Sequence, residues 1–384
     1  MSHQLTTVAR LSVARLSLFF FLAAFLLLLQ APKAEAQLGD AGEILRAGAN
    51  DSNLLMENYL KPFGAGFGAN LNTGWINTAR PYRVFGFDLR ADAALSFVPE
   101  ADRFFSVGNL AFQELELMSG SSSVTPTVSG DDFSNARVGK SYTNNNTTEE
   151  LFAFDMPQGT GYPYVPSPMA QLTLGIPMDS DISIRYSPTV EIPDVASFNL
   201  WGLGVKHGIN QWLPGGEAFP VDLSAQFGYT KLSASASFDV QPDYDPAAND
   251  TEVPPGFEAG AARWDGQGID LTASGYTANL LVGKTIPILS FYAGIGYQSS
   301  KVTIKTPGSY PITDVNRNAD GSVNQNQPKT ISEINSPINL ELNGENSFHT
   351  MAGMRIRLAI LTISGTYTLA KYPVANVGVG ISIR

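Results

Sequence analysis

Residues 85–97 read FGFDLRADAALSF, and every odd-numbered position in this stretch is apolar. The apolar positions are Phe85, Phe87, Leu89, Ala91, Ala93, Leu95 and Phe97. Successive side chains of a β-strand point to opposite faces, so the alternation predicts a strand with one apolar face. The stretch is longer than most globular strands and fits one that crosses a membrane at a tilt. It therefore favours a transmembrane β-barrel.

The same alternation recurs along most of the chain and predicts an all-β, antiparallel transmembrane barrel of about 12 strands, with 14 as the alternative count. We expect strands at residues 65–75, 82–98, 103–118, 168–176, 181–192, 197–212, 219–238, 268–284, 289–305, 336–358, 361–370 and 374–384. In the first of these, the glycines of Gly64-Ala65-Gly66-Phe67-Gly68 alternate with larger residues. An even strand number brings both chain ends to one side of the membrane.

The connector lengths support this order of strands. Short links are expected at 99–102, 177–180, 213–218, 285–288 and 359–360, and all fall on one side of the predicted barrel. The long links at 119–167, 239–267 and 306–335 all fall on the other side. Short periplasmic turns and long external loops are typical of outer-membrane barrels.

The first 63 residues differ from the rest. Arg10 and Arg15 precede an apolar run at 16–29 with one polar residue, Ser17, and Ala34-Glu35-Ala36 follows as a small-x-small cleavage site. Residues 1–36 therefore predict a secretory signal peptide, with an apolar run too short for a lasting membrane anchor. Residues 37–63 have helical spacing and predict a helical segment that ends at Pro62 and lies either in the lumen, as a plug, or under it. The barrel is expected over 64–384.

Composition excludes several classes of protein. The formal net charge is −11, which argues against nucleic-acid binding. The chain has no cysteine, so it has neither a disulfide framework nor a thiolate metal site. No nucleotide-binding or zinc motif is found, and we expect no cofactor and no metal.

Charged side chains on the polar parity of the strands are the candidate site. These lumen-facing candidates are Asp88, Arg90, Asp92, Arg185, Lys206, Asp222, Arg355 and Arg357. Such a set lines a charged pore or solute site, or forms a salt-bridge network that fills a narrow barrel. The second interpretation is favoured, because twelve strands enclose only a modest bore.

Three other features receive structural interpretations. Tryptophans and tyrosines near the strand ends, such as Trp201 and Tyr229, predict interfacial aromatic girdles. The acidic 239–267 loop matches no calcium motif and is expected to be solvated, with divalent-cation binding left open. His207 lies on the lipid-facing parity, where a membrane lipase would use it, but no serine motif accompanies it. We therefore expect no enzyme.

Several motifs resemble those of an uncharacterised family of Gram-negative outer-membrane β-barrels. They are Leu54-Leu55-Met56-Glu57-Asn58-Tyr59-Leu60-Lys61-Pro62-Phe63, Pro168-Met169-Ala170-Gln171-Leu172, Gly202-Leu203-Gly204-Val205-Lys206-His207-Gly208 and Val377-Gly378-Val379-Gly380-Ile381-Ser382. The resemblance implies a barrel in the outer membrane and assigns no activity.

A looser resemblance is to the outer-membrane transporters of long-chain fatty acids, which share long strands and an N-terminal lumen plug. The Asn-Pro-Ala motif of that plug is missing here, and that family has fourteen strands. The chain also ends in Arg384, where an aromatic residue usually completes the assembly signal. No binding residue is transferred on this basis.

These features predict passive transport or binding of a small solute, either hydrophobic or polar. The expected partners are outer-membrane lipid and the barrel-assembly machinery. The alternatives are a non-transporting surface protein that acts through its long external loops, and a soluble secreted or periplasmic β protein. The outward row at 85–97 argues against the soluble protein.

Overall fold

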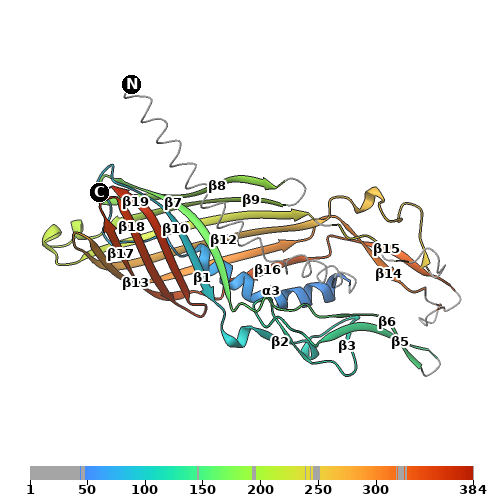
Figure 1. Cartoon of the computed structure of the whole chain (residues 1–384). Coiled ribbons are helices and arrows are strands. Elements are labelled where there is room, and N and C mark those ends of the chain that lie inside the picture. The colour runs from blue at the N-terminus through green and yellow to red at the C-terminus, as the bar shows by residue number, and fades with distance from the viewer. Residues whose placement is uncertain are drawn as a thin grey trace.

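The computed structural model describes residues 44, 48–144, 147–192, 196–237, 239–242, 244, 251–316, 318, 324 and 327–383. The signal peptide predicted at 1–36 lies outside them. The main feature is a closed ring of ten antiparallel strands (Figure 1). In ring order they are β1 (Phe87–Phe97), β7 (Tyr164–Ile176), β8 (Ser180–Ile192), β9 (Ala196–Gly208), β10 (Asp222–Ser237), β12 (Gly268–Thr285), β13 (Leu289–Lys305), β17 (Phe348–Leu358), β18 (Leu361–Leu369) and β19 (Val374–Ile383). The antiparallel barrel is confirmed, with ten ring strands in place of twelve.

The ring closes where β1 pairs with β19, from Phe87 opposite Ile383 to Ser96 opposite Val374. An eleventh strand, β16 (Asn339–Asn343), pairs with the far part of β13 and lengthens the wall there. The described helices include none that is both long enough and apolar enough to cross a membrane.

The two ends of the barrel differ in their connections. We call the end with connections 177–179, 209–221, 286–288 and 359–360 the turn end. We call the other end, with the long connections 98–163, 238–267 and 306–347 and the short ones 193–195 and 370–373, the loop end. The long links expected at 239–267 and 306–335 lie within these connections, and the one expected at 119–167 extends into the first residues of β7. The start of β1, at Phe87, and the end of β19, at Ile383, lie opposite each other at the turn end.

The loop-end connections form small sheets of their own. These contain β2 (Phe104–Ser106) with β4 (Val124–Pro126), β3 (Glu116–Leu117) with β5 (Arg137–Asn144) and β6 (Thr147–Asp155), and β11 (Thr251–Glu252) with β15 (Lys329–Asn335) and β14 (Ser309–Asp314). Short 3-10 turns occur at η2 (Glu100–Asp102), η3 (Val107–Asn109), η4 (Asn210–Trp212), η5 (Gly216–Ala218) and η6 (Ala262–Trp264). Figure 1 shows these sheets extending beyond the ring.

Two predicted strands are wrong. Residues 103–118 do not form a strand of the ring. They form β2, η3 and β3 within the first loop-end connection, so 99–102 is not a turn-end link. Residues 65–71 belong to the helix α3 (Ala49–Leu71), which continues through Pro62. Each missing strand reverses the direction of every strand after it, so two missing strands restore the predicted direction from 168 onwards. Only the 82–98 strand, which lies between the two, runs opposite to the prediction. The predicted 336–358 strand is divided between β16 and β17.

Helix α3 lies inside the loop-end half of the barrel, and its glycines are the points of closest approach. A Cβ at Gly64 would lie 2.7 Å from Leu342, and one at Gly66 would lie 2.5 Å from the Ser96 hydroxyl. Gly68 faces Ser300 in the same way. The glycine spacing that predicted a strand therefore marks close contacts on different sides of a helix, with Gly66 facing β1 and β7 and Gly64 and Gly68 facing β16 and β13. Tertiary packing of this kind overrides the local cost of glycine and proline.

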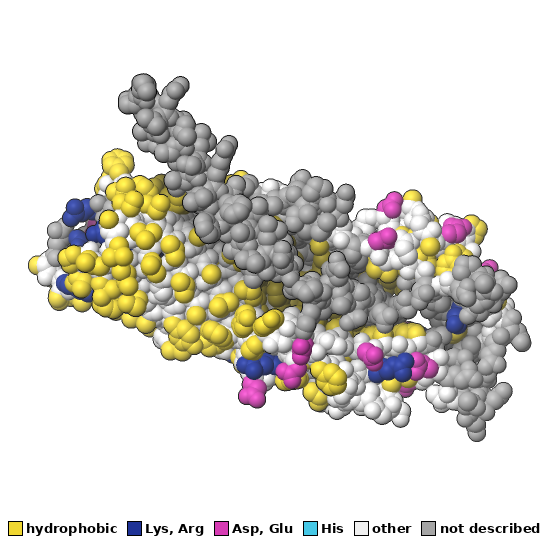
Figure 2. Space-filling model, in the orientation of Figure 1, with side chains coloured by type: hydrophobic (Ala, Val, Ile, Leu, Met, Phe, Trp, Pro, Cys, Tyr) yellow, Lys and Arg dark blue, Asp and Glu magenta, His cyan; other side chains and the backbone are white. Residues whose placement is uncertain are grey.

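The outer wall of the ring is apolar. Outward side chains such as Leu203, Ile295 and Val377 are more than half exposed to solvent. Figure 2 shows hydrophobic side chains gathered over the ring, with acidic side chains mostly towards the loop end. An exposed apolar band around a closed barrel is the surface that a bilayer covers. Outward aromatic pairs, such as Trp201 with Tyr229 at 5.4 Å between ring centroids, lie along it.

Candidate functional site in the lumen and the side wall

The segment after α3 fills the turn-end half of the lumen. We call residues 72–82 the strap. Its backbone carbonyl groups, with that of Leu71, accept hydrogen bonds from side chains of the surrounding wall. The carbonyls held in this way are those of Leu71, Thr73, Gly74, Trp75, Ile76, Thr78, Ala79 and Arg80. The strap is therefore fixed to the barrel along most of its length, and its backbone acceptors are satisfied away from water.

Arg185 and Trp75 are the centre of this arrangement. The Arg185 guanidinium donates to the carbonyls of Leu71 (2.8 Å) and Thr73, and it stacks 3.7 Å from the centroid of the Trp75 ring. The indole lies against Gly204 and Gly228, at positions where a Cβ would meet the ring. A side chain at either glycine would displace Trp75, so these glycines act as the notch that admits the strap.

Nearer the turn end, two buried ion-pair groups hold the strap. Arg90 bridges Asp92 (Nε–Oδ2, 2.8 Å) and Asp88 (Nη1–Oδ1, 3.4 Å), and it also donates to the carbonyl of Gly74. Lys206 pairs with Asp181 at 2.9 Å.

The Lys206–Asp181 pair also forms hydrogen bonds with the strap backbone. Lys206 donates to the carbonyl of Thr78 at 3.0 Å, and Asp181 accepts from the backbone N–H of Tyr82 at 2.7 Å. Paired and hydrogen-bonded charges of this kind tolerate burial that single charges would not.

Of the eight lumen-facing candidates, the structure places six inside the barrel and two at its rim. The buried six are Asp88, Arg90, Asp92, Arg185, Lys206 and Arg355. Asp222 and Arg357 lie at the turn end, where Asp222 is 4.0 Å from Arg80 and Arg357 donates to the carbonyl of Pro287 at 3.4 Å. Arg355 donates to the Tyr82 hydroxyl at 2.7 Å. Five of the six buried side chains contact the strap directly, and Asp92 does so through Arg90.

Little space remains around the strap. Two hollows of about 10 Å³ each lie beside Trp75 among the described residues, one near Asn77 and Arg90 and one near Asn279 and Thr368. That volume holds about one water molecule each and no solute. The turn-end half of the lumen is therefore closed.

The loop-end half is closed by a hydrophobic core around α3. Leu55 and Met56 of the helix pack with Leu115 and Phe154 of the first loop-end connection and with Leu340 of β16. The carboxylate of Asp51 accepts hydrogen bonds from the backbone N–H groups of residues 113, 114 and 115 at 2.8–2.9 Å. This cap fixes the helix to the external loops.

The side wall is interrupted between β7 and β8. The two strands pair from Ile176 opposite Ser180 up to Gln171 opposite Arg185, and their ladder ends there. On its other edge β7 stays paired with β1 up to Tyr164 opposite Phe97. The β7–β8 seam therefore opens over the loop-end half of β7.

Prolines explain why the pairing ends. Val98 donates to the carbonyl of Pro163, so odd-numbered residues of β7 face β1 and even-numbered ones, including Pro166 and Pro168, face β8. Continuing the register three residues beyond Gln171–Arg185 would bring Pro168 opposite Pro188. Proline has no N–H, so neither residue could donate to the ladder. A register shift of β8 against β9 starts at the same place, after Ser187.

Behind this gap lies an apolar cavity of about 360 Å³. Helix α3 contributes Phe63 and Phe67, whose rings stack at 5.6 Å between centroids. The β7 edge supplies one wall and the inner faces of β9 and β10 supply the facing wall. The remaining lining residues are Val128, Ser129, Thr160, Tyr164, Val165, Pro166, Ser167, Pro168, Phe198 and Leu232. We call it the side cavity; its size and lining are those of a site for a small apolar molecule.

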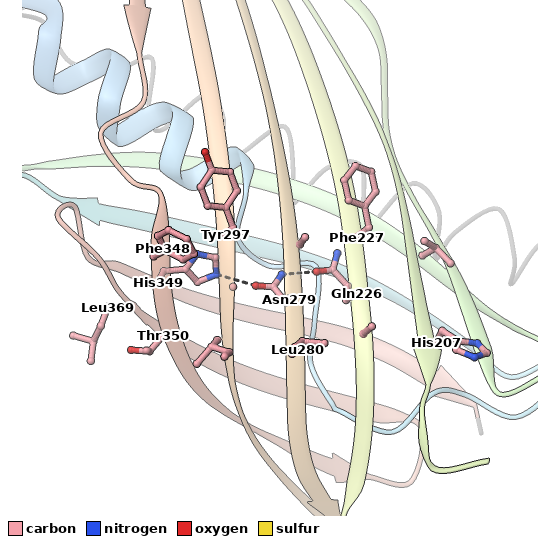
Figure 3. A pocket seen from close by; sticks show the side chains of 15 residues that line it. His207, Gln226, Phe227, Asn279, Leu280, Tyr297, Phe348, His349, Thr350 and Leu369 are labelled. Atoms are coloured by element: carbon pink, nitrogen blue, oxygen red, sulfur yellow. Dashed lines mark hydrogen bonds between the residues drawn. The ribbon is translucent and has the colours of Figure 1, made fainter. Parts of the chain in front are cut away.

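A larger hollow of about 880 Å³ lies on the outer wall (Figure 3). Its rim consists of outward side chains, among them Phe227, Leu280 and Phe348, with smaller residues such as Ala278 between them. On the inner face, His349 and Gln226 both hydrogen-bond Asn279, at 2.8 and 2.5 Å. Because the hollow faces outward on the apolar band, bilayer acyl chains account for it.

The hydrogen bonds of His207 do not fit those of a catalytic base. Its Nε2 accepts from the Trp212 indole N–H at 2.9 Å, so its proton is on Nδ1, which faces the Ser180 hydroxyl at 2.8 Å. Ser180 in turn donates to the carbonyl of Met178 at 3.0 Å. A histidine that donates to the serine is not the base a nucleophilic serine needs.

The strap and the side cavity are not predicted from the sequence. The alternation at residues 72–75 predicts a strand where the structure has the first part of the strap. The side cavity does leave a signal in the sequence: Pro166, Pro168 and Pro188 interrupt two otherwise regular strands. Proline within a predicted strand marks an edge without a partner, and two such edges facing each other predict an open seam.

The chain belongs to a family of unknown function (DUF6588), whose profile matches residues 14–383. No curated protein matches the chain. The family membership agrees with the predicted uncharacterised family and assigns no activity.

Several solved structures resemble the fold at low identity. The outer-membrane transporter YddB of Escherichia coli is 12% identical over 75% of this chain and 39% of its own, with a TM-score of 0.27. The toluene transporter TodX of Pseudomonas putida is 8% identical over 85% and 96%, with a TM-score of 0.26. The transport unit of the autotransporter AIDA-I of Escherichia coli is 9% identical over 84% and 99%, with a TM-score of 0.26. The chain thus spans about two fifths of YddB, and at these scores none of the named functions transfers to it.

Proposed function

We propose that this protein is a Gram-negative outer-membrane barrel that binds a small apolar solute in the side cavity and does not conduct polar solutes. The side cavity is the observation on which the proposal depends. It lies between an aromatic face of α3 and the barrel wall, and it has room for one small molecule.

The membrane location rests on the outward apolar band and on the signal peptide predicted at 1–36. Outward residues such as Leu203 and Ile295 are more than half exposed, which a bilayer would cover. The lack of conduction rests on the strap. A polar solute crossing the lumen would have to displace a backbone held by Arg90, Arg185 and Lys206.

The test is photolabelling of the full-length protein in lipid nanodiscs with a decane that has a diazirine group. We expect peptides containing Phe63, Phe67 and 164–168 to be labelled. The variant Phe67→Trp should fill the cavity and reduce that labelling at least fivefold. The matched control Phe348→Trp changes only the outer hollow and should leave cavity labelling unchanged.

Two results would contradict the proposal. One is labelling confined to outward residues such as Phe348, which would leave the cavity without a ligand. The other is a stable ion-conducting pore of the wild-type protein in planar bilayers, which would contradict the closed lumen.

The loop-end sheets support a second candidate, a surface protein that acts through its external loops. The sheets β3–β5–β6 and β11–β15–β14 extend well beyond the ring (Figure 1). Shortening the β5–β6 hairpin should then abolish the cellular phenotype while leaving both the barrel and the cavity labelling intact.

A further inference from the structure

We infer that the solute of the side cavity comes from the membrane, and that it enters and leaves only through the open stretch of the β7–β8 seam. The inference rests on the proposed function, because it assigns a route and a source to the ligand of that same cavity. The solute class is then apolar molecules dissolved in the bilayer leaflet at the loop end.

In the part of the chain that the structure describes, both ends of the lumen are filled. Towards the turn end, the strap is held by Arg185, Arg90 and Lys206, and the hollows beside it measure about 10 Å³ each. Towards the loop end, the α3 cap packs Leu55 and Met56 against the external loops. The side cavity lies between these two seals, and the edge residues Pro166 and Pro168 are part of its lining.

An open seam beside lipid is normally costly, because unpaired backbone N–H groups find no partner there. Here prolines lower that cost, because each one removes a backbone donor. Pro166 and Pro168 direct their ring nitrogens from β7 to the gap, and Pro188 lies on β8 where the register against β9 shifts. The sequence thus provides two edges that tolerate separation in an apolar medium.

The position of the gap identifies the leaflet. Tyr186, 63% exposed, lies at the start of the gap opposite Ala170, and Tyr164, 37% exposed, lies at its loop-end limit. Aromatic side chains of this kind favour the interface between bilayer and water. Below them, the outward side chains of Leu172 and Ile184 belong to the apolar band. The opening therefore faces the loop-end margin of the bilayer, and the cavity volume of about 360 Å³ limits the ligand to one small molecule or part of one acyl chain.

The first test closes the seam by restoring donors. In the double variant Pro168→Val/Pro188→Val the β7–β8 ladder can extend beyond Gln171–Arg185. We expect cavity labelling by the diazirine decane, flashed at increasing times after mixing, to slow at least tenfold, with the same final extent. Release should slow equally, because one opening serves both directions. The control Pro311→Val alters a strand proline of β14, far from the gap, and should change neither rate.

The second test closes the seam reversibly and does not depend on refolding. The chain has no cysteine, so Ala170→Cys/Tyr186→Cys adds a single pair at the first rung beyond the ladder. Oxidation should slow labelling, and reduction of the same sample should restore it. The control Ala91→Cys/Ala170→Cys crosslinks the β1–β7 seam, which is already paired there, and should have no effect.

The outcomes separate the route from the site. If wild-type protein labels in the cavity and closing the seam by either method leaves both rates unchanged, the route is wrong and the binding site stands. If wild-type protein shows no cavity labelling at all, the proposed function itself fails.

Discussion

The two halves of the lumen are filled in different ways. The turn-end half holds the strap, a segment of bends without regular secondary structure, and side chains of the wall, several of them charged, satisfy its backbone. The loop-end half holds a helix that satisfies its own backbone, so its surroundings are apolar. An irregular segment needs a polar wall and leaves almost no space, whereas a helix permits an apolar wall and a cavity beside it. The polar half is thus suited to sealing and the apolar half to binding.

The largest effect should come from removing the central strap contact. The variant Arg185→Ala leaves the carbonyls of Leu71 and Thr73 without their charged donor and unstacks Trp75. We expect the free energy of unfolding to fall by about 4 kcal/mol. Urea unfolding in bilayers measures this. The same variant should leak ions in planar bilayers.

The control for that variant is Arg357→Ala, an arginine of the same parity that donates only to the carbonyl of Pro287 at the rim. This variant should lower the free energy of unfolding by less than about 1 kcal/mol, and it should not leak ions in planar bilayers. Equal effects of the two substitutions would mean that the strap is not what seals the lumen.

A second variant tests the notch that receives Trp75. In Gly228→Val the new side chain would overlap the indole, and overpacking of this kind costs about 3 kcal/mol. The matched variant Gly365→Val places its Cβ where the nearest non-adjacent atom is 3.9 Å away, and it should be close to neutral. The measurement is the temperature at which the gel-mobility shift between folded and unfolded protein is lost.

In the apolar half, Phe67→Ala should have a smaller effect on stability and a clear effect on binding. Phe67 is half-buried and stacks on Phe63, so we expect a loss of about 2 kcal/mol in unfolding free energy. The side cavity becomes larger, and equilibrium labelling should shift towards bulkier diazirine probes. Phe348→Ala, at an outward position that is 81% exposed, should not change the size preference.

The smallest effect is expected outside both halves. Lys301 and Glu341 form an exposed ion pair at 2.7 Å on the outer wall near the loop end. The variant Lys301→Ala should change the unfolding free energy by at most about 0.5 kcal/mol, because exposed pairs are screened by solvent. A loss above 2 kcal/mol in the same urea assay would show that the wall there is strained.

The barrel could be predicted because alternation is a local property of the sequence. The 85–97 stretch contains all of β1, and only its first two residues, Phe85 and Gly86, belong to the turn that precedes the strand. Residues 64–75 misled for a physical reason. Glycines that allow a helix to approach the wall on several sides happen to repeat every second residue, as a strand would. Their partners Ser300 and Leu342 are more than 200 residues away, so no local pattern reveals the contacts.

The inner charges were identified by parity, but their partners were not. A carboxylate and an arginine two residues apart, such as Arg90 and Asp92, predict a lumen ion pair. That Arg90 also binds the backbone of Gly74 depends on how the preceding segment folds back. The strap has no charge pattern of its own, because it is recognised through carbonyl groups that every residue has.

The strap also dictates an order of assembly. Its partners lie on strands all around the ring; Tyr292, which donates to the carbonyl of Ile76, is 216 residues further along the chain. A ring that had already closed would have to be threaded by the strap and α3. The strands must therefore wrap around the N-terminal segment as they form, and the β1–β19 seam must close last. Such non-local contacts make folding slow, so the N-terminal segment has to be kept in position until the last strand, β19, pairs with β1.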